Sequence, residues 1–276
     1  MQDLDAKEHL EYYFVFGNSP INTKYPSIFE AINCEILQNY KEFQSKFKLQ
    51  ICPKESVKLL TKLAKSDRKR FNLTKNIPRK LATQILNELI GSSLIQIEKS
   101  KEPKPFKSKH QKLKKELRHY QIQDKIHFKD NLARFWFRFC QPNLELLEAG
   151  KFDEVLSLIK SEFEMYCSLP FELASIRLLA HHLNIPKNAF TSYWTKDDEI
   201  DIFSSIDDFI VVGEVKYKDR KICKNVLNLL KFKCEKIGIK PNLIALFSKS
   251  GFSNELLNLK DDTILLFDID DFKDIL

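Results

Sequence analysis

The sequence predicts a mixed α+β or α/β protein, with a mostly helical N-terminal part and a C-terminal mixed sheet flanked by helices. Apolar residues recur at helical spacing through most of the first 90 positions, whereas most of the short apolar runs typical of strands occur beyond residue 190. The charge also changes along the chain: residues 1–149 contain 28 Lys and Arg against 17 Asp and Glu, and residues 150–276 contain 17 against 21. This asymmetry predicts a basic surface that meets a polyanion and a second surface that presents carboxylates, although solvated faces of a lysine-rich protein would give the same totals.

Composition excludes several classes of protein. The 276 residues are 43% hydrophobic, which is enough for a packed core, and no apolar run approaches the roughly 18 residues of a membrane span. The acidic N-terminus lacks a signal core, so we expect a cytoplasmic protein without membrane association. The six cysteines form no CxxC pair and the six glycines form no phosphate-binding loop, which argues against a zinc ribbon, a disulfide framework and a self-contained ATPase.

The N-terminal half contains helical patterns followed by two strand patterns. Residues 8–49 are expected to be helical, and further helices are predicted over 54–66 and 79–90. Residues 93–98 alternate like a strand, and 119–124 are predicted to be the returning strand. Three helical segments followed by a two-stranded hairpin is the order of a winged helix-turn-helix.

Basic residues occupy the two places where such a domain meets DNA. Arg79 and Lys80 begin the predicted recognition helix, which approaches base edges from its N-terminal end. The hairpin loop 99–118 contains nine Lys and Arg against two Glu, so it could neutralise several phosphates. A solvated loop on a domain used only for protein contacts would read the same way. The candidate nucleic-acid contacts are Arg79, Lys80, Lys104, Lys107, Lys109, Lys112, Lys114 and Lys115.

The middle of the chain is expected to form a buried boundary between domains. The aromatic run 132–139 is more typical of buried structure than of a ligand site, and could serve a dimer as easily as a domain boundary. A long helix is predicted from about 152 to 183.

Four residues of the C-terminal half form a pattern that predicts a catalytic, metal-binding site. Glu214 and Lys216 lie two apart on a predicted strand over 209–217, so their side chains point to the same face. Asp201, on the preceding strand, reaches that face if the predicted five-residue turn gives a suitable register. Converging carboxylates suit Mg²⁺, with Glu172 from a helix as a third ligand. A lysine there could orient water or balance charge in a transition state, but salt bridges on one face of a sheet are the alternative.

Further lysines and arginines follow the second strand. Lys218, Arg220, Lys221 and Lys224 lie just beyond Lys216, before or within a predicted helix over about 221–237. They could steer a phosphate backbone toward the carboxylates, or they could form a solvated helix face. The next strand pattern, 243–248, is apolar enough for the interior of a sheet.

Five segments carry a family pattern in this order: YQIQD…NLARFWFRFCQPN (120–143), PFE (170–172), YW (193–194), EIDIF (199–203) and GEVKY (213–217). The order resembles the C-terminal domain of unknown function of archaeal-type AAA+/STAND ATPases, within the PD-(D/E)XK nuclease superfamily. The resemblance covers roughly residues 50–276 and implies a restriction-endonuclease-like sheet, preceded by a winged helix and without the family's ATPase. Carried over by position, Glu172, Asp201, Glu214 and Lys216 match the catalytic residues, and the three carboxylates match the metal ligands.

These patterns together predict four regions and one function. The regions are an N-terminal helical segment (1–50), a winged helix-turn-helix (51–125), aromatic linking helices (126–160) and a nuclease-like domain (161–276). The expected function is Mg²⁺- or Mn²⁺-dependent hydrolysis of phosphodiester bonds in nucleic acid, with duplex DNA as the expected partner. The alternative is a catalytically inactive DNA-binding regulator, or a partner subunit of a separate ATPase. Association into a homodimer is a further alternative.

Overall fold

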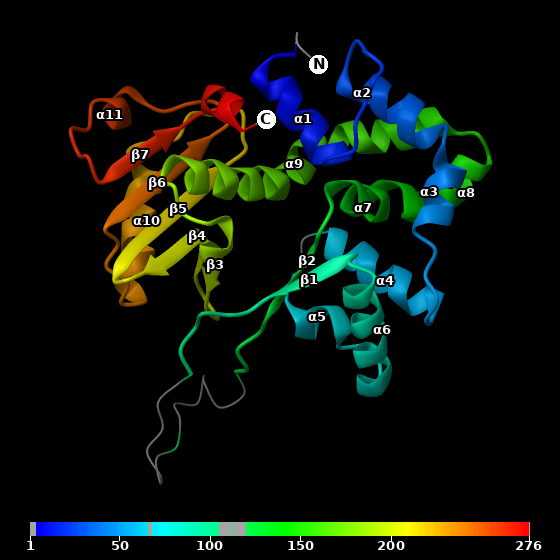
Figure 1. Ribbon diagram of the computed structural model, residues 1–276, viewed down its shortest axis with the longest axis horizontal. Coiled ribbons are helices and arrows are strands. Elements are labelled where there is room, and N and C mark those ends of the chain that lie inside the picture. The colour runs from blue at the N-terminus through cyan, green and yellow to red at the C-terminus, as the bar shows by residue number, and fades with distance from the viewer. Residues whose placement is uncertain (1–3, 66–67, 105–111, 113–119, 276) are drawn as a thin grey trace. The chain divides into compact units, whose positions relative to one another are not determined.

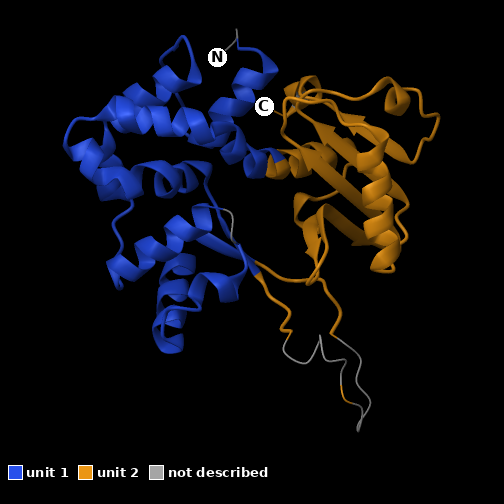
Figure 2. Ribbon diagram, turned by 180° about the vertical axis from the view of Figure 1, so that it is seen from behind, with its two compact units in different colours: residues 1–97, 125–171, 276 blue, residues 98–124, 172–275 orange. Residues whose placement is uncertain are grey.

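The computed structural model describes residues 4–65, 68–104, 112 and 120–275 (Figure 1). The chain divides into two compact units, coloured separately in Figure 2. Unit 1 comprises residues 1–97, 125–171 and 276, and unit 2 comprises residues 98–124 and 172–275. The predicted segments 1–50 and 126–160 therefore fall within one unit, together with most of the segment predicted as a winged helix.

Unit 1 begins with short helices around an apolar interior. Helix α1 (Ala6–Phe16) starts at Asp5, whose side chain accepts from the Glu8 amide at 2.7 Å while the Glu8 carboxylate accepts from the Asp5 amide at 3.1 Å. This reciprocal pair satisfies donors that the first helical turn leaves free. The next three elements are α2 (Ile28–Ala31), a π-helical turn η1 (Ile32–Leu37) and α3 (Tyr40–Lys46), so the region predicted over 8–49 is helical but interrupted.

The next part of unit 1 is three helices followed by a two-stranded sheet. The elements are α4 (Pro53–Ala64), α5 (Arg70–Thr74), α6 (Arg79–Gly91), β1 (Ile95–Glu98) and β2 (Lys125–Phe128). Helices α4 and α6 and strand β1 agree with the sequence-based prediction, whereas α5 was not predicted as a helix.

The returning strand was placed wrongly. Residues 120–124 have no regular structure, and the strand that pairs with β1 is β2, all four residues of which are buried. The reason lies in side-chain hydrogen bonds: the Asp124 carboxylate accepts from Lys99 Nζ at 2.7 Å and from the Ser100 amide at 3.3 Å, which draws this stretch out of a regular ladder.

The aromatic segment forms the core of unit 1. Helix α7 (Asn131–Phe135) continues into a π-helical turn η3 (Trp136–Cys140), and every residue from Leu132 to Cys140 is buried. The buried Arg134 guanidinium lies 4.3 Å from the ring centroid of Tyr166 and donates to the Tyr166 carbonyl at 3.1 Å. A 3₁₀ turn η4 (Gln141–Asn143), α8 (Leu144–Glu148) and α9 (Phe152–His182) follow. The long helix was predicted correctly, and its residues from Glu172 onward belong to unit 2.

Unit 2 is built on a five-stranded mixed sheet with strand order β3-β4-β5-β6-β7. The strands are β3 (Thr191–Trp194), β4 (Glu199–Ile206), β5 (Phe209–Lys216), β6 (Leu243–Ser248) and β7 (Ile264–Phe267). Strands β3, β4 and β5 are antiparallel neighbours, whereas β5, β6 and β7 run parallel to one another. Sequence patterns predicted β4, β5 and β6, but not the outer strands β3 and β7.

The turn between β4 and β5 is shorter than the predicted five residues. The strands pair up to Ile206 and Phe209, which leaves Asp207 and Asp208 as a two-residue turn, both with positive φ (46° and 64°). Asp tolerates this conformation better than most residues, and a two-residue turn of this kind matches the twist of a hairpin. The register that follows pairs Ile202 with Gly213.

Helices cover both faces of this sheet. Helix α10 (Lys224–Lys236) packs its buried residues Leu227, Leu230 and Cys234 on one face, as the spacing of three and four residues requires. The second part of α9 crosses the opposite face (Figure 1). The remaining elements are η5 (Lys187–Ala189), α11 (Asn254–Leu257) and η6 (Asp270–Asp274). No helix within the described residues combines the length and the apolar character that crossing a membrane requires.

Candidate functional site: a carboxylate–lysine cluster

The candidate site lies where the β4–β5 ladder ends. The last paired residues are Ile202 and Gly213, and beyond them the Asp201 carboxylate accepts the Val215 amide at 2.9 Å. A side-chain oxygen therefore takes the place of a ladder carbonyl, which holds Asp201 against β5 beside Glu214. Strand β5 continues past this point in parallel pairing with β6, from Glu214 to Lys216. The end of β5 is thus held firmly on one side and approached by a carboxylate on the other.

Gly213 allows this close packing next to Glu214. A Cβ atom at this position would lie 3.1 Å from both the Ala245 carbonyl oxygen and the Ile202 Cβ atom. Any larger residue would therefore push apart the strands on either side of β5.

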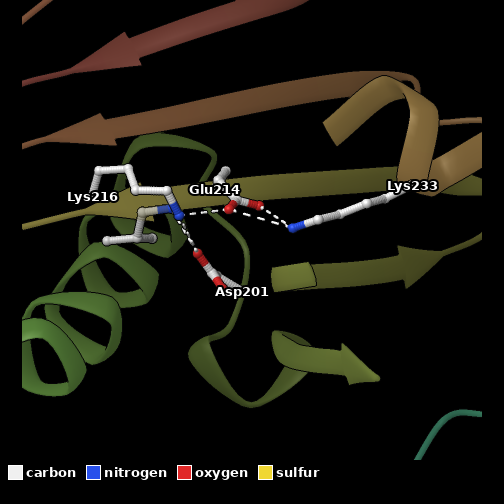
Figure 3. A network of polar contacts seen from close by, with 5 residues as sticks. Asp201, Glu214, Lys216 and Lys233 are labelled. Atoms are coloured by element: carbon white, nitrogen blue, oxygen red, sulfur yellow. Dashed lines mark hydrogen bonds and ion pairs between the residues drawn. The ribbon is translucent and has the colours of Figure 1, made fainter. Parts of the chain in front are cut away.

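Glu214 is at the centre of the site (Figure 3). It is 5% exposed, and its carboxylate contacts two amines: Lys216 Nζ at 2.6 Å and Lys233 Nζ at 3.1 Å. A buried carboxylate is costly without such partners, so the two amines offset the cost of burying Glu214. Lys216 Nζ also lies 4.0 Å from Asp201 Oδ2, which joins the two carboxylates through one amine.

The pKa of Asp201 reflects both its burial and the negative charges near it. The pKa of Asp201 is raised to about 7, chiefly by burial and then by the charges of Glu172 and Glu214, against the lowering effects of Lys216 and the Val215 amide. Only 21% of the Asp201 side chain is exposed. The lowering effect of Lys216 on the pKa of Asp201 is therefore smaller than the combined raising effects of burial and of the two neighbouring carboxylates.

The pKa of Lys216 is raised as well, which in a lysine favours the charged form. Burial by itself lowers the pKa of Lys216, but the charge of Glu214 and then of Asp201 outweighs it, together with the hydrogen bond to Glu214, so the pKa is raised overall. The ammonium form is thus favoured in this position. We call Glu172, Asp201, Glu214, Lys216 and Lys233 the carboxylate–lysine cluster.

The donor set of the cluster fits a hard divalent cation. Carboxylate oxygens are the side-chain ligands that Mg²⁺ and Mn²⁺ prefer, and an excess of buried negative charge is what a cation would neutralise. Within the described part of the chain, no three His, Cys, Asp or Glu side chains converge closely enough to hold an ion by themselves. Lys216 Nζ lies between the carboxylates instead, so a cation held by Asp201 and Glu214 requires this amine to shift.

All four residues predicted from the sequence as catalytic lie in unit 2 near one another. Asp201, Glu214 and Lys216 are in direct contact, and Glu172 of α9 is close enough to influence the charge of both Asp201 and Lys216. Lys233 was missed. The sequence shows a lysine-rich helix after β5, but which of its lysines faces the sheet depends on how α10 packs, and the sequence pattern did not single out one of them.

The predicted nucleic-acid contacts are described only in part. Arg79 and Lys80 are exposed in the first turn of α6, and Lys104 and Lys112 are exposed as well. The other four candidates, Lys107, Lys109, Lys114 and Lys115, lie outside the described residues.

The segments that flank this basic loop are fixed to the edge of the sheet, a feature that the sequence did not indicate. Glu98 accepts from the Ser192 amide at 2.6 Å and from its hydroxyl at 3.1 Å, and Trp194 Nε1 donates to the Gln123 carbonyl at 2.8 Å. Both Ser192 and Trp194 belong to β3. The loop is therefore connected at its base to the same unit as the carboxylate–lysine cluster.

The central part of the chain is similar to a family of proteins and to one further protein. A family model described as archaea bacterial proteins of unknown function matches residues 136–228. This range includes four of the five cluster residues. An uncharacterized protein of Methanocaldococcus jannaschii is 29% identical over 159 residues, which cover 54% of this chain and 35% of the relative. The chain thus spans about a third of the length of that relative. No solved structure is significantly similar to the chain.

Proposed function

We propose that this protein is a DNA-binding, metal-dependent nuclease-like protein that hydrolyses phosphodiester bonds at the carboxylate–lysine cluster. The observation that carries the proposal is the convergence of Asp201, Glu214 and Lys216 at the end of β5, where burial and then the charges of Glu172 and Glu214 raise the pKa of Asp201. This supports the expectation from the resemblance to PD-(D/E)XK nucleases, because the same residues were assigned from that pattern.

Four residues of the cluster have distinct parts in such a reaction. Asp201 and Glu214 would hold Mg²⁺ or Mn²⁺, which supplies a Lewis acid and lowers the pKa of a coordinated water. The raised pKa of Lys216 favours a positive charge, which would balance the negative charge of the phosphorane-like transition state, and the ammonium could donate hydrogen bonds to its oxygens. Lys233 holds Glu214 from the other side and so acts as a positioning residue.

Binding of DNA is supported by the order of elements in unit 1 and by exposed basic residues. Three helices and a two-stranded sheet, α4 to β2, are the order of a winged helix-turn-helix. Arg79 and Lys80 are exposed at the start of α6, which corresponds to the recognition helix. The +7 net charge of the chain favours association with a polyanion.

The experiment that tests this function is cleavage of supercoiled plasmid with Mg²⁺ or Mn²⁺ against EDTA. We expect nicked product with the wild-type protein and metal only, and loss of product in Lys216→Met, which keeps the aliphatic stem. The matched control is Lys240→Met, an exposed lysine of the same unit, which should cleave like the wild type. Cleavage by Lys216→Met at the wild-type rate would refute the proposed role of the cluster.

A second candidate is a DNA-binding regulator, or a subunit of a separate ATPase, without hydrolytic activity. It is favoured by the position of Lys216 Nζ, 2.6 Å from Glu214, which is also what a purely structural ion pair would show. This candidate predicts salt-sensitive DNA binding that EDTA does not alter, and no nicking with any metal.

A further inference from the structure

A basic cavity lies directly beside the carboxylate–lysine cluster. It has a volume of about 340 Å³ and is formed by the end of β5, the loop that follows, and the first turns of α10. Lys216, Lys218, Arg220 and Lys221 line it, together with Val226 and Leu229 of α10. Its lining therefore combines four cationic side chains with an apolar wall.

Three of these cations have no counter-charge in the described part of the chain. Lys218, Arg220 and Lys221 are exposed and form no ion pair with a described carboxylate. Neighbouring lysines differ: Lys224 Nζ lies 3.0 Å from Glu255, and Lys249 Nζ lies 2.7 Å from Asp219. A concave surface with several unpaired cations attracts an anion, and a guanidinium fork matches the oxygens of a phosphate group.

The size of the cavity indicates more than a simple anion. A volume of about 340 Å³ exceeds what an inorganic phosphate fills and lies at the lower end of pockets that bind small organic ligands. Leu229, which is 53% exposed, provides apolar surface that a sugar or a base can cover. A group with a phosphate at one end and an apolar face at the other fits this combination.

We propose that this basic cavity binds one nucleotide of a nucleic acid strand through its phosphate group. Lys216 lines the cavity and also contacts Glu214 at 2.6 Å, so the bound nucleotide lies next to the two carboxylates. The adjoining phosphate of the same strand is thereby brought to the cluster. In this role the cavity rests on the proposed hydrolytic function, since it selects which strand segment reaches the carboxylates, but binding itself requires no hydrolysis.

The test measures binding of small probes to the full chain in EDTA by isothermal titration calorimetry. The probes are thymidine 5′-monophosphate, which carries a terminal phosphate, the dinucleotide dTpdT, which has only an internal phosphodiester, and thymidine, which has no phosphate. The variant is Arg220→Ala/Lys221→Ala, and the matched control is Lys240→Ala/Lys260→Ala, which removes two exposed lysines of the same unit elsewhere. Each of these probes is small enough to occupy a single binding site.

We expect the wild type and the control to bind at least one phosphate-bearing probe and the cavity variant to bind it roughly tenfold or more weakly, because two charged donors are lost. Binding of dTpdT would identify the interior of a strand as the ligand, and binding of the monophosphate alone would identify a strand end. Equal binding of thymidine, equal affinity in the cavity variant, or no binding of any probe to the wild type would overturn the proposal. Because EDTA is present, these results are independent of the plasmid assay, so failure of the cavity and failure of the proposed hydrolysis are distinguishable.

Discussion

Replacing Asp201 with Asn should make the protein more stable at alkaline pH. In the folded chain this carboxyl is ionised against burial and against the charges of Glu172 and Glu214, which is why its pKa is raised to about 7. An unfolded chain has no such penalty. Asn has nearly the same shape and its side-chain oxygen can still accept the Val215 amide, so the exchange removes the charge while keeping the 2.9 Å hydrogen bond.

The size of the effect follows from the difference between the folded and unfolded pKa. The shift from an ordinary value of 3.8 to about 7 corresponds to about 4 kcal/mol, at roughly 1.36 kcal/mol per pH unit. Because 21% of the side chain is exposed and solvent screens part of the interaction, we expect about 2–4 kcal/mol.

The sign is set by which state holds the proton more tightly. Between about pH 4 and pH 7 the folded Asp201 keeps its proton while the unfolded one has lost it, so wild-type stability falls as the pH rises through this window. The Asn variant has no proton to lose. Its advantage over the wild type should therefore be near zero below about pH 4 and complete above about pH 7.

The assay is urea unfolding in EDTA across this pH range. Of the two tryptophans, Trp194 lies in unit 2 and Trp136 in unit 1, so a Trp136→Phe background restricts the fluorescence signal to unit 2. The matched control is Asp208→Asn, the same exchange at an exposed turn position that tolerates Asn. An Asp201→Asn advantage that does not change with pH, or a variant less stable than the wild type at about pH 8.5, would refute this reasoning.

Three further predictions concern Lys233 and Glu172 of the cluster and the exposed basic pair at the start of α6. Lys233→Met should destabilise the protein by about 1–3 kcal/mol in urea unfolding, because the buried Glu214 loses one of its two amines. Glu172→Gln should lower the pKa of Asp201, measured by carboxyl NMR titration, because it removes a nearby negative charge. Arg79→Ala/Lys80→Ala should weaken duplex DNA binding and reduce the slope of log affinity against log salt by up to about 1.8, at roughly 0.9 for each phosphate contact.

Two of these predictions have a matched control variant, and the third has a direct contradicting outcome. Lys231→Met alters an exposed lysine of the same helix and should change stability by less than about 0.5 kcal/mol. For Glu172→Gln, an unchanged Asp201 titration would show that the two carboxylates do not interact. For the DNA-binding pair, Lys48→Ala/Lys54→Ala removes the same charge from exposed positions of unit 1, and an equal loss of affinity would mean that binding depends only on net charge.

Most of the site could be predicted because it depends on strand geometry. Glu214 and Lys216 are two residues apart on a strand, so their shared face follows from the sequence alone. Asp201 is different: its position depends on a turn, and the predicted five-residue loop is a two-residue turn at Asp207 and Asp208. The expectation that Asp201 approaches Glu214 was therefore correct, although the turn length assumed for it was wrong.

The features that the sequence did not reveal arise from packing between distant segments. Lys233 contacts Glu214 only because of the way α10 lies on the sheet. The returning strand is Lys125–Phe128 rather than 119–124, because Asp124 bonds to the facing segment through its side chain. Strand β3 was missed since its four residues give too short an alternation to separate from a loop.

The central claim is that Asp201 and Glu214 hold a divalent cation, and Mn²⁺ binding followed by electron paramagnetic resonance tests it most directly. Free Mn²⁺ gives a sharp signal that disappears on binding, so the stoichiometry is read without any need for catalysis. We expect one bound ion per wild-type chain and loss of that ion in Asp201→Asn, with binding retained in Asp208→Asn. Absence of binding to the wild type, or equal binding to Asp201→Asn, would contradict this claim.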